Sequence, residues 1–412
     1  MNQRPARARP RVLALLCLLS SLSAAAAHGA AGSAASGAAS GAKAFPPDGK
    51  APAQPVLPRA AFSPAEAALR RAAVLAHPER YVTIGSAPAE FRTLKEALAA
   101  PDDGRRTFVL TDPVHREEGT RIGRDLTLCG FGAGESVLEA AASAAEAKGR
   151  VLEVERGASV LLAGLTVRNG RIMDVPRRAG GIANSGTLSM EDCAVSGNVA
   201  TYGVGVWTEG RLRMLRCAVT GNVGRPRPQP DQYKGVDDGG AGAGLRIEKG
   251  GFALVEDCLI AWNEAPTAGG GVQLCCEASA RLVDTTIFGN RAGVRGGGVN
   301  QSGGSLTLEA CSIAGNRAAA KGQAFFHRGR LKMSGSLIAA EAGLAYFLST
   351  DKGGDVGRGI LELNEGNFCE SGELPGAATG KLGVLLLADS GGALPVLALP
   401  EGSPARGYGA RP

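Results

Sequence analysis

Residues 287–316 read IFGNRAGVRGGGVNQSGGSLTLEACSIAGN and contain one complete copy of the unit that decides the fold. The unit begins with an aliphatic-x-Gly-Asn corner at 287–290, passes through a glycine cluster at 296–298 and ends on the same corner pattern. Between them, Leu306 and Leu308 alternate with polar residues, which is the two-residue period of a strand with one buried face. Asparagine at a corner can bond its neighbours, and glycine permits a positive φ.

Corner asparagines recur along the chain, four of the six directly after a glycine, and successive ones are 29, 24, 41, 27 and 26 residues apart: Asn169, Asn198, Asn222, Asn263, Asn290 and Asn316. A near-constant period in this range predicts a solenoid of one repeated unit. We therefore predict an all-β fold, a single-stranded right-handed parallel β-helix with a short N-terminal capping helix. An antiparallel sandwich is the alternative, but it does not explain a corner asparagine at near-constant spacing.

Four cysteines share one place in the repeat, five residues before the corner asparagine: Cys193, Cys217, Cys258 and Cys311. In-register stacking puts them in one inward column, with neighbouring α-carbons about 4.8 Å apart. Disulfides tolerate that spacing and occur in exported proteins. Side chains that point in parallel favour free thiols, which act as small hydrophobes. We therefore expect free thiols. The chain contains no Cys-x-x-Cys motif, so we do not expect structural zinc.

The N-terminus has the order of an export signal. Four arginines within the first eleven residues precede an apolar run from Val12 to Leu22 and small residues that end at Ala27. This pattern predicts a signal peptide over residues 1–27 and an extracellular, cell-envelope or surface location for the mature protein. Without those arginines the net charge falls from +6 to +2. A nearly neutral chain gives no indication of nucleic-acid binding, and no later segment is apolar enough to span a membrane.

The rest of the chain divides into four parts. Residues 28–60 are mostly Ala, Gly, Ser and Pro and predict a flexible spacer. Residues 61–104 predict a helical cap, residues 105–340 the β-helix coils, and residues 341–412 the last coils with a C-terminal cap.

The predicted cap contains two helix starts. Pro64 follows a capping serine, and a helix there would end before Pro78. Thr93 to Glu96 form a capping box that opens a short helix over residues 94–99. Strands are expected next at 107–110 and 125–128.

Three segments resemble known β-helix families. The cap is similar to the entry of pectate-lyase-like β-helices, in which a T-x-x-E-A helix precedes an L-T-L-x-G strand; here these are Thr93–Ala97 and Leu126–Gly130. The repeat is similar to that of chlamydial polymorphic outer-membrane proteins. The tail, with LADSGG at 387–392 and LPEGSPA at 399–405, resembles choice-of-anchor-Q β-helix proteins. The resemblance implies this fold and an extracellular or envelope location, but no defined reaction.

Two long loops give the best candidate for a site. The 41-residue interval contains an insertion between Asn222 and Gly242, and a loop at 171–178 leaves the same corner two coils earlier. We expect both to project from one side and to flank a groove beside the short turn at Tyr202. The candidates for catalysis are Asp237, Asp238, Arg177 and Arg178, and the candidates for binding are Asp174, Asp231, Tyr233, Lys234 and Tyr202.

The chemistry of this groove stays open in the sequence. Enzymes on this fold usually cut or epimerise acidic polysaccharides, and a lyase needs carboxylates for calcium and an Arg or Lys base. Charges on long loops are usually solvated, and no complete catalytic set or metal site can be read. We therefore expect a non-catalytic protein, without a cofactor, that binds extracellular polysaccharide or a surface protein. The alternatives are a polysaccharide lyase or epimerase, which would use calcium, and a purely structural spacer.

Overall fold

The structure is a computed structural model. It describes residues 57–58, 64–173, 178–226, 240–340, 345–348, 360–370, 374, 377–380, 382, 386–388, 394–399 and 403–405, and all of them belong to one compact unit. The predicted signal peptide and nearly all of the spacer therefore lie outside the described residues.

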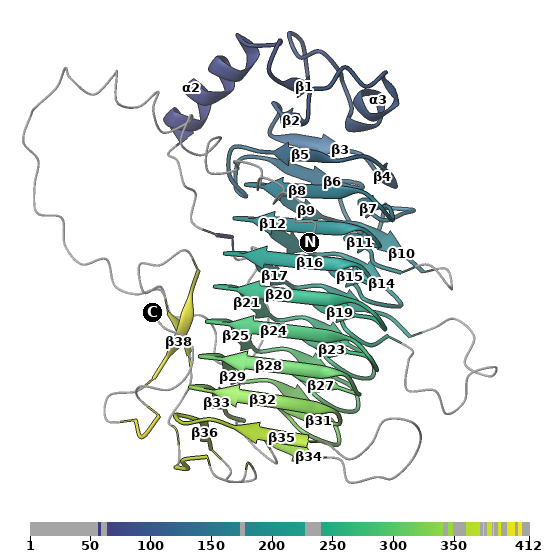
Figure 1. Cartoon of the computed structure of the whole chain (residues 1–412). Coiled ribbons are helices and arrows are strands. Elements are labelled where there is room, and N and C mark those ends of the chain that lie inside the picture. Colours follow the sequence, from purple (N-terminus) through teal and green to yellow (C-terminus); the bar gives the residue numbers. More distant parts are fainter. Residues whose placement is uncertain are drawn as a thin grey trace, which may run out of the picture. The chain divides into compact units, whose positions relative to one another are not determined.

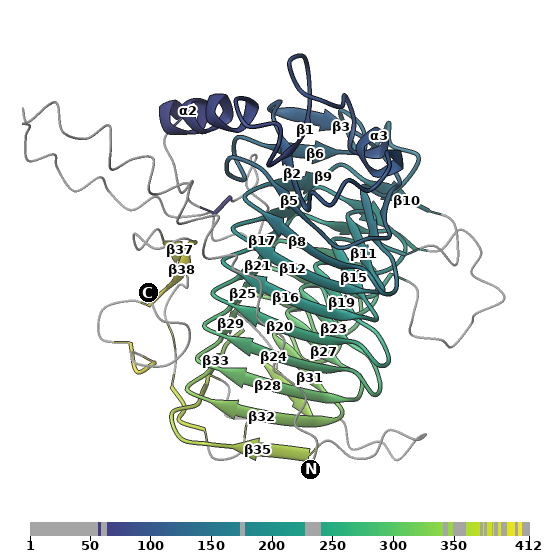
Figure 2. The ribbon, with the colours of Figure 1, turned by 45° about the horizontal axis from the view of Figure 1, so that its top comes forward.

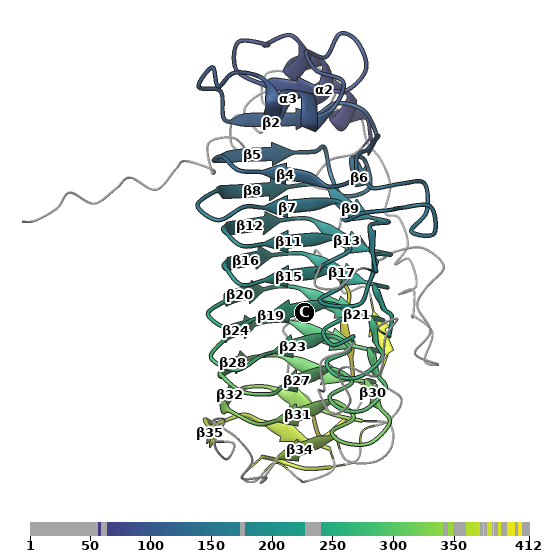
Figure 3. The same cartoon turned by 90° about the vertical axis from the view of Figure 1, so that its right-hand side faces the viewer.

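The described chain winds into a parallel β-helix whose coils stack in sequence order (Figure 1). A complete coil gives one strand each to sheets C, A, B and D, in that order along the chain, and strands of successive coils pair in parallel. Figure 3 shows the successive strands of sheets A and C from the side. The predicted all-β parallel β-helix is thus confirmed, and the antiparallel sandwich is excluded.

The strands of the four sheets are as follows. Sheet A contains β1 (Val82–Ile84), β2 (Thr107–Leu110), β5 (Leu126–Cys129), β8 (Ser159–Ala163), β12 (Thr187–Glu191), β16 (Arg211–Leu215), β20 (Phe252–Glu256), β24 (Ser279–Val283), β28 (Ser305–Glu309), β32 (Arg330–Ser334) and β35 (Ile360–Leu363). Sheet B contains β3 (Val114–Arg116), β6 (Val137–Glu139), β9 (Thr166–Arg168), β13 (Ala194–Ser196), β17 (Ala218–Thr220), β21 (Leu259–Ala261), β25 (Thr286–Phe288), β29 (Ser312–Ala314), β33 (Leu337–Ile338) and β36 (Phe368–Cys369). Sheet C contains β4 (Thr120–Ile122), β7 (Leu152–Val154), β11 (Ile182–Asn184), β15 (Val206–Thr208), β19 (Leu245–Ile247), β23 (Val272–Leu274), β27 (Val299–Gln301), β31 (Phe325–His327) and β34 (Tyr346–Leu348). Sheet D contains β10 (Arg171–Ile172), β14 (Val199–Ala200), β18 (Val223–Gly224), β22 (Glu264–Ala265), β26 (Arg291–Ala292) and β30 (Arg317–Ala318).

The corner asparagines form a buried ladder between sheets B and D. Asn222 Nδ2 donates to Asn263 Oδ1 over 2.9 Å, and Asn263 Nδ2 donates to Asn290 Oδ1 over 3.0 Å. The same contact joins Asn198 to Asn222 and Asn290 to Asn316. Each amide also bonds backbone groups of its neighbours, so the corners hold successive coils in register.

The first corner differs from the prediction. Asn169 does not belong to the ladder; it takes the left-handed conformation, with φ 60°, and its Nδ2 bonds Ala141 O and Ala142 O. The ladder place in that coil belongs to Gly170, whose N–H donates to Asn198 Oδ1. The alignment at Asn169 was therefore wrong by one residue, because Asn169 itself takes the left-handed position that a glycine or Trp262 takes before the other ladder residues.

A glycine directly before five of the sheet C strands, β11, β15, β19, β23 and β27, faces the ladder from across the coil. A Cβ added to Gly244 would lie 2.9 Å from Asn263 Nδ2, and one on Gly271 would lie 3.0 Å from Asn290 Nδ2. Such contacts are closer than ordinary van der Waals distances. The repeat therefore pairs glycine with asparagine because the inward amide occupies the space that a side chain opposite would need.

The cysteine column is inward and the thiols are free, as predicted. Each thiol donates to the carbonyl oxygen two residues earlier, for example Cys258 Sγ to Glu256 O over 3.1 Å. Thr285 makes the same contact through its hydroxyl, over 2.9 Å, and so does Ser336. This position in the repeat therefore suits a small side chain that can donate one hydrogen bond to the backbone. Burial raises the pKa of Cys311 to about 12, which keeps that thiol unreactive.

The N-terminal end of the solenoid is closed by helices, at the end where β1 and β2 lie (Figure 2). The short helix α3 (Leu94–Ala99) has the predicted capping box at Thr93, and its Leu94 and Ala97 are part of the main core. The longer helix α2 (Pro64–Leu75) begins at the proline that the sequence indicated. Helix α3 thus covers apolar groups that an open first coil would expose, whereas Ala67 and Val74 of α2 pack in a separate cluster with Val109 and Phe131.

The C-terminal part contains a hairpin of β37 (Leu386–Ala388) and β38 (Val396–Ala398), which pair antiparallel. Its Leu387 and the nearby Leu394 belong to one apolar cluster with Trp262 and Phe288, which lie at the outward side of sheet B. The tail predicted to cap the solenoid thus packs on the flank of the coils.

Candidate functional site

The structure describes only part of the predicted groove. Arg178 and Tyr202 lie in described segments. The other candidates fall outside the described residues: Asp174, Arg177, Asp231, Tyr233, Lys234, Asp237 and Asp238. We therefore build the site from the two described candidates and their neighbours.

Arg178 and Tyr202 both lie against the outward face of sheet C. The middle residue of each sheet C strand from β11 to β34 points outward, and the pairing register places these residues in one column: Ala183, Trp207, Arg246, Gln273, Asn300, Phe326 and Phe347. Most are buried although they face outward; Arg246 is only 2% exposed. We call them the sheet C column.

The loops that lead into sheet C cover this column. Gly203 has φ 51°, and a Cβ there would lie 2.8 Å from Trp207 Cβ. Gly296 has φ 59°, and its added Cβ would lie 2.8 Å from Asn300 Cβ. Only glycine permits both this conformation and this closeness. The glycine clusters therefore let the backbone close over the outward side chains.

Around Trp207 and Arg246, the sheet C column forms a compact cluster of charged and aromatic side chains. Glu248 Oε1 accepts hydrogen bonds from Arg246 Nε over 2.6 Å and from Trp207 Nε1 over 3.3 Å. The Arg246 guanidinium lies 4.2 Å from the centre of the Tyr202 ring, and that of Arg178 lies 4.7 Å from the centre of the Trp207 ring. Cations above aromatic faces are attracted by the ring quadrupole. Arg178 and Tyr202 therefore contact Trp207 and Arg246, which are neighbours in the sheet C column.

The charge state of this cluster follows from its ion pairs. Burial works against ionisation of Glu248, but the charge of Arg246, its hydrogen bond and that of Trp207 together hold the pKa of Glu248 below its usual value. The carboxylate is therefore ionised at neutral pH. Glu209 at the rim lies 3.2 Å from Arg156 and 3.9 Å from Arg178.

From Gln273 to Phe347, the sheet C column consists of two amides followed by two stacked rings. Asn300 Nδ2 donates to Gln273 Oε1 over 2.6 Å, and Gln273 Nε2 donates to Ser302 Oγ over 2.9 Å. Phe326 and Phe347 stack with centroids 5.4 Å apart. Arg295 and Lys321 lie over these rings, at 4.9 Å each. Polar donors, acceptors and cations therefore continue along successive coils.

The sequence contained a signal for this column. Trp207, Arg246, Gln273 and Asn300 each follow the first aliphatic residue after a glycine cluster, and strand alternation points that position outward. The column is visible only when the repeats are aligned on the glycines rather than on the loops.

One buried histidine in the lower coils makes stability depend on pH. His327 bonds Gly329 O through Nε2 over 2.9 Å, and its Nδ1 contacts Tyr346 Oη. Burial lowers the pKa of His327 to about 4, although the bond to Gly329 opposes this, from 6.5 for an exposed imidazole. The neutral form is thus favoured by folding, so this contribution is complete above about pH 6.5 and is lost as the pH falls through about 4.

We expect acidification from about pH 7 to about pH 4 to cost up to about 3 kcal/mol at this site. The measurement is urea unfolding across that pH range, followed by circular dichroism, for the unchanged chain and for His327→Gln. The variant should lose less stability on acidification than the unchanged chain. Equal losses in the two proteins would show that His327 does not titrate as its burial indicates.

Within the described ranges, no group of three or more His, Cys, Asp or Glu side chains could hold a metal ion. Among the same residues, no helix is long and apolar enough to cross a membrane. Comparison with known proteins gives no match: no protein-family model fits the sequence, and no curated protein and no solved structure matches it. The likeness to pectate-lyase-like, polymorphic outer-membrane and choice-of-anchor-Q proteins therefore stays a prediction.

Proposed function

We propose that this chain is an exported β-helix that binds an extracellular polysaccharide along the outward face of sheet C and leaves it chemically unchanged. The observation that carries the proposal is the sheet C column, with Arg178 and Tyr202 half-buried at its rim. Export rests on the signal-peptide pattern of residues 1–27.

The repeat favours a linear polymer as the ligand. Parallel strands present equivalent positions about every 4.8 Å, so a chain laid along the column meets successive coils. Gln273 and Asn300 are buried and bonded to each other, so the ligand would meet the half-buried or exposed groups that lie over the column: Arg178, Tyr202, Arg295 and Lys321. Because buried contacts hold these side chains in place, binding them costs little conformational entropy.

The described carboxylates do not favour catalysis. A general acid needs a pKa raised toward the working pH, whereas that of Glu248 is lowered. Glu209 is engaged by Arg156 and Arg178. Both groups therefore support a binding role, in which they fix the positions of arginines.

We expect Arg178→Ala and Tyr202→Ala to weaken polysaccharide binding about tenfold or more, because each removes a rim group held against the column. The measurement is affinity electrophoresis of the full chain in gels that contain pectate, alginate or a glycosaminoglycan. The matched control is Arg211→Ala, since Arg211 also lies over a ring, that of Phe252, at 5.7 Å, but on the outward face of sheet A.

The control should bind within about twofold of the unchanged chain. Equal weakening by Arg211→Ala would place binding elsewhere or make it non-specific. Unsaturated products, detected by their ultraviolet absorbance after incubation with calcium, would replace the proposal with a lyase.

A further inference from the structure

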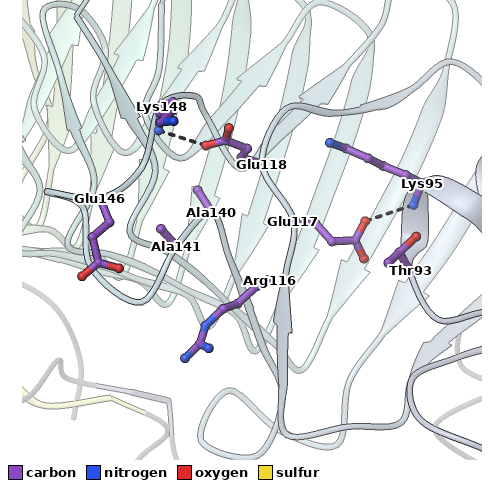
Figure 4. Close-up of a pocket in the computed structure, with 9 residues that line it drawn as sticks. All are labelled: Thr93, Lys95, Arg116, Glu117, Glu118, Ala140, Ala141, Glu146 and Lys148. Atoms are coloured by element: carbon purple, nitrogen blue, oxygen red, sulfur yellow. Dashed lines mark hydrogen bonds between the residues drawn. The ribbon is translucent and has the colours of Figure 1, made fainter.

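A cavity of about 480 Å³ lies between the N-terminal cap and the first coils, away from the sheet C column. Three segments line it. They are the start of α3 with Thr93 and Lys95, the end of β3 with Arg116 to Glu118, and the loop after β6 with Ala140, Ala141, Glu146 and Lys148. Figure 4 shows Lys95 on one side of the cavity and Glu146 and Lys148 on the opposite side. A cavity of this size can hold a small organic molecule.

The carboxylates that line the cavity already have partners. Glu117 is buried, and its two oxygens accept the backbone N–H groups of Leu94 and Lys95 over 2.5 Å and 3.0 Å. Glu118 accepts the backbone N–H of Lys148 over 2.9 Å. These bonds join the cap to the coils, so the negative groups serve the architecture of the cavity.

The third carboxylate of the wall, Glu146, is exposed and accepts one side-chain hydrogen bond, from Ser143 Oγ over 3.0 Å. Burial raises the pKa of Glu117, although the backbone donors oppose the rise. Of the three carboxylates in the wall, Glu117 is buried, Glu118 is half-buried and only Glu146 is exposed.

The cations of the wall are available. Lys95 and Lys148 are exposed. Among the described residues neither ammonium group forms an ion pair, although the charge of Lys95 acts on Glu117 from a distance. Arg116 pairs with Glu139 over 2.8 Å, yet its side chain stays 64% exposed. Arg168 also bonds Glu139, over 2.8 Å, so Arg116 does not neutralise that carboxylate alone.

We propose that this cavity binds a small polyanion, a molecule with two or more phosphate or sulfate groups, between Lys95, Lys148 and Arg116. Lysine acts as a point charge toward such groups, and arginine offers a fork of donors. Three cations from three segments suit a ligand with several anionic groups better than a ligand with a single carboxylate. This site is separate from the polysaccharide face and does not depend on it.

The test is isothermal titration calorimetry of the full chain with two probes, inorganic pyrophosphate and sucrose octasulfate, at low ionic strength, where exposed charges are least screened. The combined variant Lys95→Met, Lys148→Met should bind the better probe about tenfold or more weakly. Glu146→Gln should bind it about twofold more tightly, because it removes a repulsive charge from the wall. Binding of one probe alone would distinguish a free diphosphate-like ligand from anionic groups carried on a sugar.

The control is Lys332→Met, which removes an exposed lysine on sheet A, outside the cavity. It should bind like the unchanged chain, and so should Arg178→Ala, which tests the polysaccharide face. The proposal is overturned by binding of neither probe, by unchanged binding in the double variant, or by an equal loss with Lys332→Met. Since both lysines are exposed, circular dichroism should show the same fold in every variant.

Discussion

Replacing Asn263 with alanine should lower the free energy of unfolding by about 4 kcal/mol, because buried polar groups that lose their partner cost about 1–3 kcal/mol each. The Asn263 amide makes four bonds. Its oxygen accepts the N–H and Nδ2 groups of Asn222 over 3.1 Å and 2.9 Å, and its Nδ2 donates to Val219 O and Asn290 Oδ1. Alanine leaves the Asn222 N–H and the Val219 carbonyl buried without these partners.

The measurement is the midpoint of urea unfolding, with hydrogen exchange of the amides in β17, β21 and β25. Exchange should quicken most there, since coils of a solenoid contact mainly their neighbours. The matched control is Asn364→Ala, because Asn364 is exposed and lies outside the ladder. A loss below about 1 kcal/mol in Asn263→Ala would mean that the coils keep their register without the ladder.

Replacing Gly271 with alanine should destabilise the fold by about 3 kcal/mol, at the upper end of the range for overpacked cores. The new Cβ would lie 2.6 Å from Gly298 O and 3.0 Å from Asn290 Nδ2. Gly298 O accepts the N–H of Val272 over 2.8 Å, so relief of the contact would stretch the pairing of sheet C.

Thermal unfolding followed by circular dichroism measures this effect. The control is Gly134→Ala, whose added Cβ would meet only Leu57 Cδ1, at 3.8 Å, and which should be neutral or slightly stabilising. Removing the amide as well, in Gly271→Ala with Asn290→Ala, should not restore stability, because the contact with the Gly298 carbonyl remains. Recovery in the double variant would show that the amide alone excludes a side chain.

The sequence predicted the coils well because their chemistry is local. Glycine before a corner asparagine, aliphatic alternation and the Thr93 capping box act over a few residues, and each recurs in the structure. The prediction failed at Asn169 because the left-handed place there is taken by asparagine itself. A corner pattern shows which residue types suit a turn, but it does not show which of two positions each will occupy.

The site was less predictable. Arg178 and Tyr202 were identified from their loops, yet their partners Trp207 and Arg246 come from strands on different coils. A charged loop residue that is solvated and one that is held over an aromatic ring have the same sequence pattern. The difference depends on which rings the stacking register brings beneath them.

The sequence by itself determined the parallel β-helix, its corner asparagines, the inward cysteines and the capping helix, since each follows from strand period, turn geometry or helix capping. Only the tertiary structure decided that outward residues of sheet C are buried and that the glycines lie opposite the ladder. It also decided that the cap and first coils enclose a cavity at Lys95, Arg116 and Lys148. The physical reason is that these contacts join different strands, loops and coils, as in Gly271 with Asn290 and Tyr202 with Arg246, so their energies depend on how the coils close and stack.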